Sequence, residues 1–198
     1  MKRKILALLL CAVVCVSLAS CGSKRESAQS VVENGIKALQ NYDVESIQTY
    51  WGSEVDESSG DDPQMEEMMK AVFSHLSYSI VSSNEDEAAG TATVTVEFTN
   101  IDMDKVVSSF MSEAITIVFQ YALLPEEQQP SDEELEGMYM DKFMELLNNE
   151  NNETVKKTAD VELSLVDDEW KIAPSEDVID AMLGGMISSF NAVNESFS

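Results

Sequence analysis

Cysteine and histidine are scarce in this chain of 198 residues, which has three cysteines and one histidine. Cys11 and Cys15 lie in an apolar segment at the N-terminus, and Cys21 follows directly after that segment. No cysteine follows Cys21, so residues 22–198 hold no thiol and can form no disulfide with one another. Thiol catalysis and cysteine-ligated metal sites are excluded from that part of the chain, and its hydrophobic core alone must stabilise the fold.

The single histidine also rules out the His pairs and HExxH motifs that bind zinc. His75 is expected at a junction between a helix and a strand, where a structural role is commoner than general-base catalysis. No G-x-S-x-G motif, S-x-x-K motif or glycine-rich phosphate loop occurs. Acidic pairs such as Asp61-Asp62 and Asp167-Asp168 fall in predicted turns or helix starts, without EF-hand spacing. The sequence therefore predicts no catalytic residue, no metal ligand and no cofactor.

Basic residues are few as well: 12 lysines and arginines stand against 37 acidic residues. Three of the basic residues and none of the acidic ones precede Cys21, so the chain from Cys21 onward has nine basic residues and a net charge of −28. Such a surface repels nucleic-acid phosphates and anionic lipid headgroups, which argues against a nucleic-acid partner. The acidity most simply supports solubility, and binding of cations or basic partners is the sharper alternative.

The N-terminus has the pattern of an export signal. Lys2-Arg3-Lys4 precedes an apolar run over residues 5–19, which is the layout of a secretory signal peptide. At about 15 residues, the run is shorter than the roughly 20 that a membrane-spanning helix needs. The residues that follow, Leu18-Ala19-Ser20-Cys21, resemble the lipobox of bacterial lipoproteins. That resemblance implies cleavage before Cys21 and a diacylglyceryl group, with palmitate, on its thiol.

Two alternatives to lipidation remain. Ser17-Leu18-Ala19 could serve as an ordinary cleavage site that releases a soluble protein, or the run could stay uncleaved as an anchor. The lipoprotein interpretation predicts attachment to the extracytoplasmic face of the cell membrane, since two acyl chains give stable anchoring. It divides the chain into a signal peptide (1–20), a lipidated cysteine with a short tether (21–26) and a single domain (27–198).

Hydrophobic periodicity predicts an α+β domain. Helical spacing is expected over 27–41, 43–51, 63–76, 103–124, 131–147 and from 174 onward, with a capping box at Ser131–Glu134. Alternation of apolar and polar residues predicts strands over 76–80, 91–99, 159–165 and 169–172. The expected order of elements is three helices, a strand hairpin, a two-helix insertion, a second hairpin and a C-terminal helix.

This order of elements resembles the cone-shaped α+β fold of nuclear-transport-factor-2-like proteins. Residues 38–47 resemble the first helix–helix joint of that group, and residues 161–172, like Leu183-Gly184-Gly185, resemble the end of small Gram-positive lipoproteins of unknown function. The resemblance implies that the N-terminal helices pack on a curved antiparallel sheet of about four strands, which forms a cone with a pocket. It transfers no activity because this fold hosts enzymes, carriers and assembly modules. The candidate pocket residues are aromatic, and ordinary core packing is the alternative for each: Trp51, Tyr78, Phe98 and Trp170.

Methionine is frequent, with eleven in the chain. Most of them lie on helical apolar stripes, the rows of apolar residues at helical spacing, and are predicted to be core residues. Met140 lies outside the apolar stripe of its helix. The leading functional hypothesis is a non-enzymatic lipoprotein that binds a small apolar molecule or a partner protein. One alternative is an assembly scaffold that acts through the helical pair at 103–150, and another is a carboxylate-based hydrolase or isomerase with a buried acid near a tyrosine.

Overall fold

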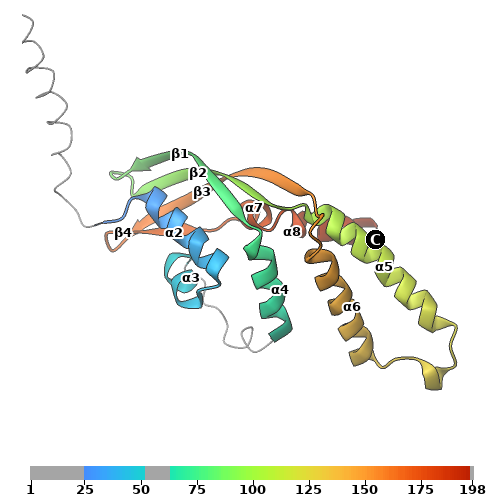
Figure 1. Ribbon diagram of the computed structural model, residues 1–198. Coiled ribbons are helices and arrows are strands. Elements are labelled where there is room, and N and C mark those ends of the chain that lie inside the picture. The colour runs from blue at the N-terminus through green and yellow to red at the C-terminus, as the bar shows by residue number, and fades with distance from the viewer. Residues whose placement is uncertain (1–24, 52–62, 197–198) are drawn as a thin grey trace, which may run out of the picture.

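The computed structural model describes residues 25–51 and 63–196. Its centre is one antiparallel sheet with the strand order β1-β2-β3-β4 (Figure 1). The strands are β1 (Ser77–Asp86), β2 (Thr91–Ile101), β3 (Thr154–Val166) and β4 (Glu169–Ala173). The predicted α+β class with four antiparallel strands is confirmed. The predictions made for residues 1–24, including the signal peptide and Cys21, and for the acidic pair Asp61-Asp62 lie outside the described residues.

Two strands are longer than the side-chain pattern indicated. β1 continues past Ile80 to Asp86, opposite Thr91 of β2, with an irregularity in register between Ile80 and Ser82. Its second half is exposed and polar, so the strand is held there by backbone pairing and not by an apolar face. In β3 the pairing with β2 likewise begins at Thr154, well before the alternating apolar residues.

The N-terminal helices cover the sheet as predicted. α2 (Ala28–Asn41) begins at Ser27, whose hydroxyl accepts from the backbone N–H of Ser30, and it ends at Tyr42 in the left-handed conformation. The carboxylate of Asp43 then accepts from the N–H of Ser46, which caps α3 (Val44–Trp51). α4 (Pro63–Ser74) has proline at its first position, where a missing N–H costs nothing.

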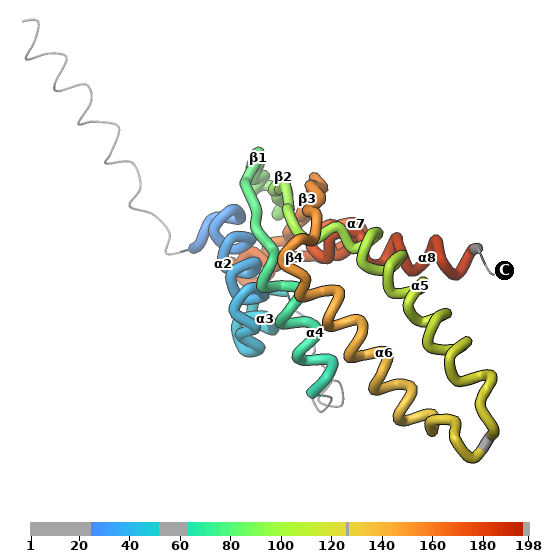
Figure 2. Tube along the Cα trace, turned by 45° about the vertical axis from the view of Figure 1, so that its right-hand side comes forward, coloured from blue at the N-terminus to red at the C-terminus, as the bar shows by residue number. Residues whose placement is uncertain are grey.

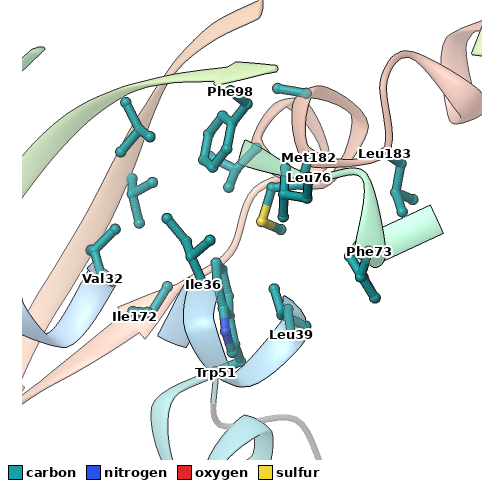
Figure 3. Packing of buried hydrophobic residues seen from close by; sticks show 14 of the residues in the cluster. Val32, Ile36, Leu39, Trp51, Phe73, Leu76, Phe98, Ile172, Met182 and Leu183 are labelled. Atoms are coloured by element: carbon teal, nitrogen blue, oxygen red, sulfur yellow. The ribbon is translucent and has the colours of Figure 1, made fainter. Parts of the chain in front are cut away.

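The core lies between α2 and the sheet (Figure 3). The strand β2 supplies its central row, because every second residue from Ala92 to Phe98 is buried. Ile36 of α2 and Ile172 of β4 belong to the same cluster. Asn100 is buried at the edge of this core, where its amide nitrogen donates to the carbonyl oxygens of Val72 and Met182. It thereby ties the ends of α4 and α7 to β2.

The insertion between the hairpins is a helical pair that extends away from the sheet (Figure 2). It consists of α5 (Met103–Ala122), a short 3₁₀ turn (Glu126–Gln128) and α6 (Asp132–Leu147). The capping box is present, with Ser131 and Glu134 bonding each other's backbone N–H groups. The pair is called the arm below.

The predicted C-terminal helix is present as two helices, α7 (Glu176–Met182) and α8 (Met186–Ser196). The break falls at Gly184 and Gly185, which both have positive φ angles. A Cβ atom on Gly184 would lie 2.0 Å from the carbonyl oxygen of Ile101, so only glycine fits this close approach. The carbonyl of Gly184 accepts from the N–H of Met103 at 3.2 Å, which docks the break onto the start of α5.

Candidate functional site

An open groove lies where the arm meets the body of the domain, and its volume is about 270 Å³. Four helices line it, and almost all of its surface is apolar. Glu136 on α6 is its one charged lining residue within the described chain. The full lining is Met68 of α4, Phe110 of α5, Glu136, Tyr139, Met140 and Phe143 of α6, and Met186 and Phe190 of α8.

A set of edge-to-face aromatic contacts stiffens one side of this groove. The ring of Phe110 lies 5.4 Å from that of Phe143 at an interplanar angle of 89°, and 6.4 Å from that of Tyr139 at 83°. This geometry suits the ring quadrupoles. Phe143 is only 6% exposed, so it anchors the cluster in the core. The groove therefore has a rigid aromatic side.

Methionines from three helices, together with Phe190 of α8, supply the rest of the apolar lining. Met68, Met140 and Met186 are all half-buried, and a thioether side chain adapts its shape to what it contacts. Met140, the methionine that departs from the apolar stripe in the sequence, is thus explained by its place in the groove. Its off-stripe position was the one signal in the sequence, because the other methionines of the lining, Met68 and Met186, fall on helical apolar stripes.

The four aromatic residues that sequence analysis named for a pocket have different environments. Trp51 is buried, and its indole N–H donates to the carbonyl of Gly35 at 2.9 Å. Phe98 is fully buried in the core beneath the sheet. Tyr78 is half-buried, and burial, followed by the negative charge of Glu33, raises its pKa. Whether these side chains contact a ligand stays a prediction.

Trp170, the fourth of them, lines a smaller cavity of about 190 Å³. Arg25 lies over its ring, 5.7 Å from the ring centroid, and Tyr50 and Lys171 are also in the lining. The indole nitrogen of Trp170 is buried and has no hydrogen-bond partner among the described residues. Because that atom is inaccessible, a ligand in the cavity could not bond to it without movement of the chain.

Asp180 is a buried carboxylate with a structural explanation. It accepts from Lys157 Nζ at 2.8 Å, from Ser188 Oγ at 2.8 Å and from the N–H of Ser188 at 3.0 Å. Burial raises the pKa of Asp180, but the bonds from Lys157 and Ser188 outweigh it and hold the pKa below the ordinary value. The residue caps the first turn of α8 and ties it to β3. No tyrosine is among these partners.

The outer side of α5 exposes a second apolar surface. Phe119 is 67% exposed and Leu123, at the end of the helix, is 87% exposed. Ile115 and Val118 are about half exposed on the same helix. The spacing of three and four residues places these side chains on one side of the helix. We call Ile115, Val118, Phe119 and Leu123 the outer stripe.

The described chain keeps an excess of negative charge after its ion pairs are counted. Each lysine or arginine between residues 25 and 196 forms an ion pair with a carboxylate of the same chain. The many remaining carboxylates have no basic partner within the described residues. In that part of the chain no group of three or more His, Cys, Asp or Glu residues is arranged to hold a metal ion. Nor is any helix described there long and apolar enough to cross a membrane.

Comparison with known proteins yields little. No protein-family model matches the chain, and no curated protein matches it. A solved structure of YcdA from Bacillus subtilis, which is named as a lipoprotein, superposes with a TM-score of 0.41 at 12% sequence identity. The match covers 81% of this chain and 47% of YcdA, so the chain spans about half the length of that structure. A likeness this distant assigns neither a fold family nor a function, and the resemblance to nuclear-transport-factor-2-like proteins stays a prediction.

Proposed function

We propose that the protein is an extracytoplasmic lipoprotein, anchored through Cys21, whose domain binds a partner protein in the four-helix groove and is not an enzyme. The observation that carries the proposal is the groove itself. It is open, apolar and built from side chains of α4, α5, α6 and α8. An apolar concavity with one polar group at its margin is what a recognition site for apolar side chains requires.

The anchoring half of the proposal is supported by the sequence Leu18-Ala19-Ser20-Cys21 after a short apolar run. It is tested by fractionation of cells that express the full chain. The wild-type protein should remain with the membranes and carry lipid on Cys21 by mass spectrometry. The variant Cys21→Ala should lose the lipid. An unmodified Cys21 in membrane-associated protein would contradict this half.

The groove is tested with a neutral apolar fluorophore, N-phenyl-1-naphthylamine, whose emission rises when it leaves water. We expect the purified protein to bind it, and we expect Met140→Glu and Phe190→Glu to weaken binding at least tenfold. Phe119→Glu is the matched control, because it adds the same charge to an exposed apolar position of the arm outside the groove. Equal binding by the groove variants and the wild-type protein would overturn the assignment.

An assembly scaffold that acts through the arm is the second candidate, and the outer stripe favours it. Monomeric proteins seldom leave such a contiguous apolar surface uncovered. Sedimentation analysis separates the two functions: self-association that Phe119→Glu abolishes would support the scaffold, whereas a monomer that binds the fluorophore would support the groove. For a carboxylate-based enzyme, the buried acid Asp180 offers little support because Lys157 and Ser188 already engage it.

A further inference from the structure

We propose that the groove docks a basic amphipathic helix of the partner protein. This inference rests on the proposed function and specifies the chemistry of the partner. Two properties of the site carry it: the continuity of the groove with an acidic face of α6, and the absence of unpaired cations in the described chain.

The acidic face begins where α6 begins and leads into the groove. Residues spaced by three, four, seven and eight positions lie on one side of a helix. Asp132, Glu133 and Glu136 therefore share a side of α6 with the groove residues Tyr139, Met140 and Phe143. None of the three carboxylates pairs with a lysine or arginine of the described chain.

The helix dipole accounts for part of this acidity. Asp132 and Glu133 lie in the first turn of α6, where the helix dipole stabilises negative charge. Glu136 lies beyond that turn and lines the groove itself. An apolar groove with a carboxylate at its margin and two more along the same face is complementary to a ligand whose apolar side is flanked by cations.

The charge of the rest of the protein selects the source of those cations. The described lysines and arginines are all engaged with carboxylates of their own chain. A second copy would therefore bring a further net charge of −28, counted from Cys21 onward, with no unpaired cation among its described residues to offset it. An anionic lipid surface is repelled for the same reason. Of a second copy, an anionic lipid surface and a basic partner, only the basic partner is attracted electrostatically to the acidic face of α6.

The dimensions of the groove favour a helix over a small molecule. From Asp132 to Phe143 the face is about 17 Å long at 1.5 Å per residue, which is roughly three helical turns. The groove is open and holds about 270 Å³, whereas sites for small molecules usually enclose most of the ligand. The groove accommodates a few apolar side chains that project from one side of a docked helix. The three methionines let the lining adapt to them.

Three synthetic peptides test the proposal by fluorescence anisotropy with the full-length protein in detergent. The first is a leucine–lysine peptide of about 18 residues, roughly five turns, with the leucines at helical spacing. The second replaces each lysine by glutamate, and the third scrambles the first. We expect the first peptide to bind at least tenfold more tightly than the scrambled one, more weakly as salt is raised, and the glutamate peptide not to bind.

Matched variants locate the binding site. The triple variant Asp132→Asn, Glu133→Gln and Glu136→Gln should weaken binding of the leucine–lysine peptide about tenfold. The control triple variant Glu45→Gln, Glu150→Gln and Glu162→Gln removes the same charge from exposed positions outside the groove, and it should bind like the wild-type protein. Circular dichroism verifies that both triple variants are folded.

The remaining outcomes separate this inference from the proposed function. If the fluorophore binds in the groove but the two triple variants bind the peptide equally, the basic-helix proposal is overturned and the groove stands. If the scrambled peptide binds as tightly as the ordered one, the attraction is nonspecific charge and the proposal is overturned as well. If the groove variants Met140→Glu and Phe190→Glu bind the fluorophore as tightly as the wild-type protein, by contrast, the proposed function itself is contradicted.

Discussion

Arg25 joins both hairpins of the sheet through a single side chain, and its guanidinium lies 2.5 Å from the carboxylate of Asp168. Asp168 belongs to the turn between β3 and β4. The same guanidinium contacts Glu87, in the turn between β1 and β2, at 2.9 Å, and it lies over the ring of Trp170. At 12% exposure, it is shielded from water far more than a surface arginine usually is, so these contacts should count toward stability.

Arg25→Ala should lower the free energy of unfolding by about 1–2 kcal/mol, because it removes two charge-assisted contacts and a cation–π contact. Chemical denaturation measures this effect. The fluorescence emission of Trp170 should shift at the same time, with Trp51 as the only other tryptophan. Lys171→Ala is the control: its ion pair with Glu169 is exposed, and its loss should change stability by less than about 0.5 kcal/mol. Equal effects of the two substitutions would contradict the role of Arg25.

Two glycine-to-alanine substitutions should have opposite effects. Gly184→Ala places a methyl group against the carbonyl oxygen of Ile101 at a positive φ angle, so it should destabilise the fold by several kcal/mol. Gly137→Ala lies within α6, where a Cβ atom meets nothing within 4 Å. It should stabilise the fold by about 0.5–1 kcal/mol through helix propensity. Thermal unfolding followed by circular dichroism compares them, and a tolerated Gly184→Ala would refute the close approach.

The carboxylate of Asp180 should contribute to stability in a pH-dependent manner. Its pKa in the folded state lies below the ordinary value of 3.8. Its contribution is therefore fully present above about pH 4 and is lost as the pH falls through the folded-state pKa. Asp180→Asn should cost about 2 kcal/mol at pH 7, and the difference from the wild-type protein should shrink below pH 4. Urea denaturation at several pH values measures it.

Asp141→Asn provides the control for that series, because Asp141 is exposed on α6. Its substitution should change the free energy of unfolding by less than about 0.5 kcal/mol at pH 7. A difference between Asp180→Asn and the wild-type protein that stays constant from pH 7 to pH 3 would contradict the ionic role of Asp180.

The two sides of the arm should respond differently to substitution. Phe119→Ser on the outer stripe should leave the free energy of unfolding within about 0.5 kcal/mol of the wild-type value, because the ring is largely exposed. Phe143→Ala on the inner side should cost about 3–5 kcal/mol, because it opens a cavity in the core. Denaturant titration distinguishes them. A large loss of stability in Phe119→Ser would show that the outer stripe is covered in the native protein.

Local chemistry made much of the fold predictable. The alternation of apolar and polar residues from Ala92 to Phe98 identified β2, because one face of that strand is buried and the other faces solvent. The capping box at Ser131 marked the start of α6, since its bonds involve residues only three apart. The polar half of β1 gave no such signal, because backbone pairing with β2 makes the strand there. The break at Gly184 depends on the backbone of Ile101, 83 residues earlier, which no local pattern reveals.

The groove was harder to predict for a related reason. Met68, Met140 and Phe190 come from helices that are far apart in the sequence, and each helix by itself shows only an apolar stripe. Whether a stripe ends in the core or at the margin of a groove depends on how the helices cross. Met140 was exceptional because it fell off its own stripe, so that core packing could not explain it. A residue that local patterning leaves unexplained was therefore the useful guide to the site.

The contacts of Arg25 with the two hairpin turns also bear on the orientation that the proposed lipid anchor at Cys21 would impose on the domain. Cys21 lies four residues before Arg25, a span of at most about 14 Å of chain. If Cys21 is lipidated as we propose, the two hairpin turns would lie beside the bilayer, and Figure 1 shows the arm at the opposite end of the domain. The groove and the outer stripe would then face away from the membrane. A partner would meet them by arriving through the surrounding medium, not by lateral diffusion within the lipid.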